Sequence, residues 1–223
     1  APPGSLDVAA VIANDLRGTG RFAPIATTDM LQKPTAGAQV RFDDWKMVGV
    51  EALVVGRVVE SQAGQFSVQF ELLDVLRRQP LLAYQIPTDA PGMRFAAHRA
   101  ADMIYEKLTG VAGVFATRVV YVTAVRRGPR AQTFRLIVAD ADGESAQTMV
   151  ESAEPIMSPS WSPDGRTLAY VSFENKQPEI YVQALRSGVR QRVSARAGVN
   201  GDAARRLERG EQIGHGLSPV GRS

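Results

Sequence analysis

Apolar residues recur at helical spacing in two stretches of the amino-terminal half of the chain. Residues 5–16 predict an amphipathic helix with Ser5 as its N-cap and with an apolar face made of Leu6, Ala9, Ile12, Ala13 and Leu16. Residues 93–108 predict a longer helix with an apolar stripe made of Phe95, Ala97, Ala101, Ile104 and Leu108. Residues 43–45, two aspartates and a tryptophan, begin a short helix with an acidic first turn.

Alternating apolar and polar positions predict strands elsewhere. Residues 21–28 predict a short strand, and residues 52–61, 65–75 and 80–88 predict three longer ones. Further strands are expected at residues 117–125 and 133–143 and after the Asp142-Gly143 turn. Helices mixed with strands indicate an α+β or α/β layer, whereas the part after residue 117 is all strand and turn. The architecture therefore changes near residues 113–117.

A strongly specified hairpin lies further along, in the run "WSPDGRTLAYVS". Trp161 precedes the turn Ser162-Pro163-Asp164-Gly165, in which Pro163 fixes φ and Asp164-Gly165 supply the left-handed positions. Four strands with turns at this spacing are typical of one propeller blade. An ordinary hairpin meander is the alternative interpretation.

Composition narrows the function classes. The 223 residues are 44% hydrophobic and 22% charged with a net charge of +3, which is ordinary for a globular protein. The chain has no cysteine, which excludes thiol catalysis, thiolate zinc sites and disulfides. Its basic residues are spread out and are not interleaved with aromatics, so we expect no nucleic-acid partner. It has no apolar run of about 18 residues, so we expect no direct membrane insertion. The first residues have no leader pattern, which indicates a mature or truncated product.

Few residues are candidates for catalysis or for binding a metal or cofactor. His98 has no second histidine in register on its helix, so a surface or half-buried polar role is favoured over metal binding. His215, in "GHGLS", does not fit a nucleophile elbow. Residues 140–144 carry three carboxylates but do not complete a calcium loop, and the Asp142-Gly143 pair favours a two-residue hairpin turn. We therefore expect no catalytic, cofactor-binding or metal-binding residue, and no enzyme.

Four runs together resemble the TolB family of periplasmic propeller proteins of the Tol-Pal system. They are "VIANDLRGTGRFAPI", "GVEALVVGRV", "ADMIYEKLTGVAGVFATRVVYV" and "EPIMSPSWSPDGRTLAYVSFENKQPEIYVQAL". The resemblance implies two helices on a mixed five-stranded sheet, followed by a six-bladed propeller without catalysis. It also implies an adaptor that contacts the peptidoglycan-associated lipoprotein (Pal) and the inner-membrane Tol proteins. Such an adaptor supports outer-membrane integrity and constriction at cell division. Which residues bind these partners stays unknown.

The resemblance divides the chain into three segments. Residues 1–150 are predicted as the amino-terminal domain, with an inner boundary near residues 113–117. Residues 151–201 are predicted as one blade of an incomplete propeller. Residues 202–223 are predicted as a non-homologous tail, either disordered or frameshifted. If Leu207-Glu208-Arg209 is encoded CTG-GAG-CGx, reading one base later gives Trp-Ser, as in the blade turn.

We therefore expect a largely non-functional fragment with weakened or lost partner binding. Its single blade would lack support on both faces. The alternatives are the non-catalytic propeller region of a serine oligopeptidase-like protein and a free-standing α/β ligand-binding domain. The latter would show a pocket lined by convergent polar groups.

Overall fold

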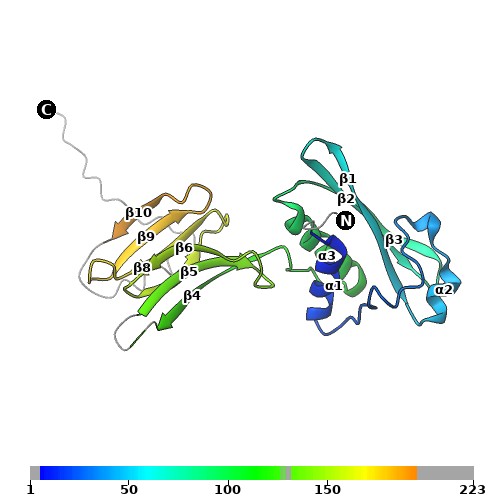
Figure 1. Ribbon diagram of the computed structural model, residues 1–223, viewed down its shortest axis with the longest axis horizontal. Coiled ribbons are helices and arrows are strands. Elements are labelled where there is room, and N and C mark those ends of the chain that lie inside the picture. The colour runs from blue at the N-terminus through cyan, green and yellow to red at the C-terminus, as the bar shows by residue number, and fades with distance from the viewer. Residues whose placement is uncertain (1–5, 127, 129–131, 195–223) are drawn as a thin grey trace. The chain divides into compact units, whose positions relative to one another are not determined.

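The computed structural model describes residues 6–126, 128 and 132–194, which form two compact units divided between Thr117 and Arg118 (Figure 1). His215 and the predicted tail, residues 202–223, lie outside the described residues. Among the described residues, no helix is both long and apolar enough to cross a membrane.

Helix α1 (Val8–Gly18) begins later than the sequence predicts. Its N-cap is Asp7, not Ser5, and the Asp7 carboxylate accepts a hydrogen bond from the Ala10 N–H at 3.1 Å. A carboxylate satisfies an orphan N–H and also interacts favourably with the helix dipole. Leu6 lies before the helix and is 38% exposed, and Ala9 is exposed too. The buried apolar residues of α1 are Val11, Ile12 and Leu16.

A three-stranded antiparallel sheet follows, made of β1 (Ala52–Gln62), β2 (Gln65–Asp74) and β3 (Gln79–Asp89) in the order β1-β2-β3. Helix α3 (Met93–Thr109) and α1 lie on one side of this sheet, and the short helix α2 (Phe42–Met47) lies on the other (Figure 1). A short 3-10 turn, η1 (Gly37–Gln39), precedes α2.

The central strand β2 is buried on both faces, because alternate side chains enter two cores. Phe70 and Leu72 pack under the helices, whereas Leu73 packs with Trp45 of α2. The core under the helices consists of Val11, Ile12, Leu16, Phe70, Leu72, Ala97, Ala100, Ala101 and Ile104. The first unit is therefore a layered α+β domain.

Two details of the first unit differ from the sequence-based prediction. Phe95 is 56% exposed, because residues two apart on a helix point to nearly opposite sides and Ala97 faces the core. Residues 21–28 do not pair in a sheet; Pro24 has no N–H to donate, and Phe22 packs instead against Tyr105 at 6.0 Å between ring centroids. The described residues thus form three antiparallel strands here, where the resemblance implies a mixed sheet of five.

The described part of the second unit contains two antiparallel sheets. The first consists of β4 (Arg118–Arg126), β5 (Gln132–Asp140) and β6 (Gln147–Ser152). The second is a four-stranded meander of β7 (Ile156–Trp161), β8 (Thr167–Ser172), β9 (Glu179–Ala184) and β10 (Arg190–Ser194). Each strand of the meander pairs with the next one along the chain, which is the arrangement of a propeller blade.

The connection between β5 and β6 is longer than the predicted two-residue turn. Gly143, at φ +86°, forms a tight turn in which its N–H bonds to the Asp140 carbonyl at 2.9 Å. Strand β6 begins only at Gln147, so residues 141–146 join the two strands. The turn therefore forms where the sequence predicts it, but the hairpin around it is wider.

The two sheets of the second unit share one hydrophobic core. Leu136 and Val138 of β5 and Leu168 and Tyr170 of β8 belong to one buried cluster, against which Val120 and Val122 of β4 also pack. Strands β4–β6 therefore lie in the second unit, whereas a domain ending near residue 150 would place them in the first. The two units divide after Thr117, within the inner boundary region predicted near residues 113–117. The meander is accordingly not a lone blade, because β4–β6 cover one of its faces.

Candidate functional site

The Ser-Pro-Asp-Gly turn joins β7 to β8 and is closed by its own side chains. The Ser162 hydroxyl donates to the Asp164 carboxylate at 2.6 Å and accepts a hydrogen bond from the Thr167 N–H at 3.0 Å. The same carboxylate accepts from the Arg166 N–H at 3.0 Å. The bond from Ser162 and then the bond from Arg166 hold the pKa of Asp164 below its ordinary value. Gly165 takes φ +66°, as the sequence predicts, whereas Asp164 does not take the left-handed conformation predicted for it.

Arg118 contacts this turn from the first position of β4. Its guanidinium carbon lies 5.2 Å from the Trp161 ring centroid, and its Nη2 donates to the Gly165 carbonyl at 3.0 Å. The stacking and the hydrogen bond together fix the planar guanidinium. The sequence around the turn does not indicate its contact with Arg118, because Arg118 lies 47 residues before Gly165.

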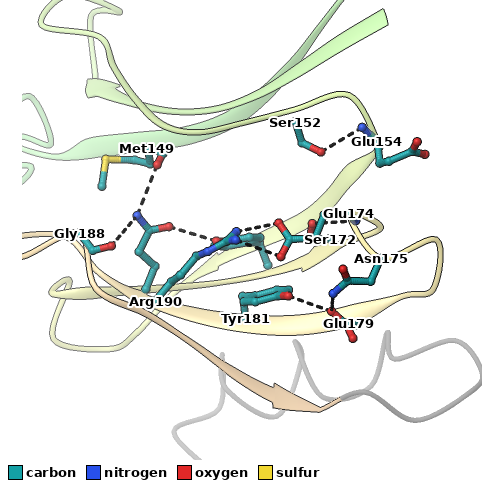
Figure 2. Close-up of polar contacts among 12 residues, drawn as sticks. Met149, Ser152, Glu154, Ser172, Glu174, Asn175, Glu179, Tyr181, Gly188 and Arg190 are labelled. Atoms are coloured by element: carbon teal, nitrogen blue, oxygen red, sulfur yellow. Dashed lines mark hydrogen bonds and ion pairs between the residues drawn. The ribbon is translucent and has the colours of Figure 1, made fainter.

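A second polar group occupies the meander (Figure 2). The rings of Tyr170 and Tyr181 stack with centroids 5.9 Å apart, and the Arg190 guanidinium lies 4.8 Å from the Tyr181 centroid. Arg190 also forms a bidentate pair with Glu174 at 2.9 and 3.0 Å. This pair raises the pKa of Arg190. The polar group therefore joins β8, β9 and β10.

Glu179 is the other acid of this group and is 5% exposed. Its carboxylate accepts hydrogen bonds from Asn175 at 2.7 Å, from Tyr181 at 2.8 Å and from Arg192 at 2.8 Å. The bonds from Asn175 and Tyr181 are the main causes that lower the pKa of Glu179. All three donors favour the ionised carboxylate.

The pKa values of the other groups follow from burial and these hydrogen bonds. Burial alone would raise the pKa of Glu174, but the proximity of the Tyr181 hydroxyl and the pair with Arg190 outweigh it, and the net shift is downward. Burial, followed by the nearby carboxylates of Glu174 and Glu179, raises the pKa of Tyr181. Burial also raises the pKa of Tyr170. Both acids are thus held ionised beside arginines, an arrangement that stabilises strands.

Gln183 connects the meander to the neighbouring sheet. Its Oε1 accepts from the Tyr170 hydroxyl at 3.1 Å, and its Nε2 donates to the Met149 carbonyl of β6 at 3.4 Å and to the Gly188 carbonyl at 3.3 Å. Figure 2 labels the acceptors of the two Nε2 bonds, Met149 and Gly188, together with the Arg190–Glu174 pair. A buried amide with several partners specifies how the two sheets meet.

In the first unit, His98 is fully buried, whereas the sequence predicts a position on the helix surface or half-buried. Its Nδ1 lies 2.7 Å from an Asp15 carboxylate oxygen, and both side chains are almost inaccessible. The pair links α1 to α3. Sequence reasoning missed Asp15 because the two residues are 83 positions apart.

A shallow groove of about 390 Å³ crosses the sheet of the first unit. Arg57, Gln69, Glu71 and Gln85 contribute to its lining. Three of these polar groups are engaged within the fold: Arg57 donates to Gln69 at 3.0 Å, and Glu71 accepts from the Gly37 N–H at 3.0 Å. These bonds give Arg57 and Glu71 a structural role in the sheet.

The fold defines the class of protein: an α+β domain followed by consecutive antiparallel sheets of a β-propeller. Residues 2–81 match the family of the TolB amino-terminal domain, and residues 105–212 match the TolB beta propeller domain. The chain belongs to the TolB family. The propeller match runs beyond residue 201, where the sequence predicts the homologous part to end.

Named relatives agree with this assignment. The chain is 45% identical over 196 residues to the Tol-Pal system protein TolB of Nitrosococcus oceani and 46% identical over 194 residues to that of Thioalkalivibrio sulfidiphilus. Each comparison covers 87% of this chain but only 45% and 44% of the relative. The crystal structure of TolB from Acinetobacter baumannii superposes with a TM-score of 0.77 at 34% identity, covering 88% of this chain and 49% of that one. The chain thus spans a little less than half the length of these relatives.

Proposed function

We propose that the gene encoding this chain specifies a non-enzymatic periplasmic adaptor of the Tol-Pal system. In this role it supports outer-membrane integrity and constriction during cell division. The observation that carries the proposal is the second unit: two sheets on one core, with a Ser-Pro-Asp-Gly turn, in a chain 45% identical to a TolB protein. Rigid sheets of this kind present a surface to partners.

The polar groups of the second unit support a non-enzymatic role. Glu174 and Glu179 each pair with an arginine and lie within reach of Tyr181. A general base or nucleophile needs a carboxylate directed at a substrate with a pKa near the working pH. Here both pKa values are lowered by contacts within the meander. The groups therefore serve to order strands and present them rigidly.

The proposed partners are the peptidoglycan-associated lipoprotein and the inner-membrane Tol proteins. An affinity-tagged copy of the gene at its natural locus, cross-linked in cells, tests this directly. We expect the lipoprotein and at least one inner-membrane Tol protein to be retained, with a tagged, unrelated periplasmic protein as the control. Recovery of neither partner above that control would refute the assignment.

For the isolated chain, we propose that affinity for the lipoprotein is weak. Interface energy concentrates in a few desolvated residues at the centre of a patch, and two sheets present only part of a propeller face. Calorimetry against the soluble lipoprotein domain is expected to show no binding at micromolar concentrations. A dissociation constant below about 1 μM, equivalent to about −8 kcal/mol, would show that these two sheets suffice.

A further inference from the structure

The segment that joins the two units is held on the first unit up to Ala116. The Asp102 carboxylate of α3 accepts hydrogen bonds from the Phe115 N–H at 2.7 Å and from the Ala116 N–H at 3.2 Å. The Phe115 ring packs edge-on against Tyr105, with centroids 5.6 Å apart. Two backbone bonds and one aromatic contact therefore fix this segment to α3.

Gly113 permits this close approach. A Cβ atom at residue 113 would lie 2.5 Å from the Cα of Asp102, a separation that side chains do not adopt. The requirement for glycine is steric, because the chain passes directly over the helix backbone. The contact at Gly113 and the bonds at Phe115 and Ala116 thus form one continuous attachment.

On the other side, the chain is held by the second unit from Arg118 onward. Arg118 is the first residue of β4 and pairs with Asp140 of β5. Its side chain stacks on Trp161 and donates to the Gly165 carbonyl at 3.0 Å. The Ser-Pro-Asp-Gly turn therefore contributes to fixing the point where the chain enters the second unit.

Only Thr117 lies between these two attachments. We propose that Thr117 is a single-residue pivot, and that rotation of the units relative to each other is confined to its backbone bonds. Its hydroxyl donates to the Val114 carbonyl at 2.7 Å, which ties the side chain to the first unit. Hinges are commonly a few residues at the ends of elements that absorb changes in φ and ψ. Residues 111–116 move with the first unit although they have no regular secondary structure.

Insertions on either side of the first attachment test the pivot. Two glycines would be inserted between Thr117 and Arg118, or between Val111 and Ala112. Ala63 and Arg186, both exposed, would be changed to cysteine and spin-labelled, since the chain has no cysteine of its own. The distance distribution between the labels would then be measured by electron–electron resonance.

We expect the insertion after Thr117 to broaden the distribution by about 8 Å, the reach of two flexible residues. The insertion after Val111 should leave it unchanged, because the attachment to Asp102 isolates it from the second unit. Equal broadening by both insertions, or none after Thr117, would overturn the proposal.

A change at Asp102 links the effect to the attachment itself. In an Asp102→Ala background, the insertion after Val111 should now broaden the distribution, whereas a Glu106→Ala background on the same helix should not permit this. Thermal unfolding checks that each variant is folded. If Asp102→Ala does not fold, the comparison of the two insertions in the unchanged chain still decides the question. An unchanged distribution in folded Asp102→Ala would show that Asp102 is not the attachment.

Discussion

Asp15 and His98 illustrate how individual residues stabilise the first unit. The two side chains meet at 2.7 Å between α1 and α3, in a layer otherwise made of alanine and aliphatic residues. A buried polar group needs a partner, because the cost of burying it alone exceeds the gain from one hydrogen bond. Each residue of the pair therefore depends on the other.

Removing the imidazole should be strongly destabilising. In His98→Ala, the Asp15 carboxyl loses this buried partner, and we expect the free energy of unfolding to fall by about 3 kcal/mol. Urea unfolding measures it, with Arg99→Ala on the exposed side of the same helix as the control. A loss no larger than that of the control would contradict the role given to the pair.

At the scale of the element, the four-stranded meander depends on two ionised glutamates. Glu174 and Glu179 have pKa values below the ordinary carboxyl value of 4.5 in the folded chain. A group with a lowered pKa contributes stability above its unfolded pKa, and this contribution is lost as the pH falls through the folded value. Acid should therefore weaken the meander.

This argument predicts a pH dependence. We expect the melting temperature of the second unit to fall as the pH is lowered below about 4.5, the carboxyl value in the unfolded chain. Glu174→Gln should flatten that fall, whereas Glu144→Gln, at an exposed position, should leave it unchanged. Thermal unfolding followed between pH 7 and pH 3 gives the comparison. Identical profiles for the two variants would argue against the role of Glu174.

The core shared by the two sheets gives a second prediction at this scale. Leu136 is fully buried, so Leu136→Ala should lower the free energy of unfolding by about 2–5 kcal/mol. Because the core is shared, hydrogen exchange should also accelerate in β7–β10. Val125→Ala, at a residue 44% exposed, is the matched control. Unchanged protection of β7–β10 would mean that the sheets fold independently.

Much of the secondary structure could be predicted from the sequence, because strand alternation and helical spacing are local properties. The paired strands β1–β3 and the Gly165 turn followed directly from alternation and turn chemistry. What covers a strand's apolar face could not be predicted, since the partner lies far along the chain. The cover that β4–β6 provide for the meander, and the Arg118 contact, are of this kind.

At the scale of the whole molecule, the division after Thr117 makes residues 118–194 one folded body. Proteolysis should therefore not separate β4–β6 from β7–β10, whereas a domain that ended near residue 150 would be released by cleavage there. With a glutamate-specific protease, we expect the bond after Glu151 of β6 to remain uncut until the second unit unfolds. A stable product ending near residue 150, identified by mass spectrometry, would contradict this.

The central claim is that this gene serves the cell envelope as a Tol-Pal adaptor. Deleting it and measuring detergent sensitivity together with leakage of a periplasmic marker tests the claim most directly. The account predicts a leaky, detergent-sensitive envelope and chains of undivided cells, all restored by the intact gene supplied in trans. An envelope that stays intact and cells that divide normally after the deletion would contradict the account.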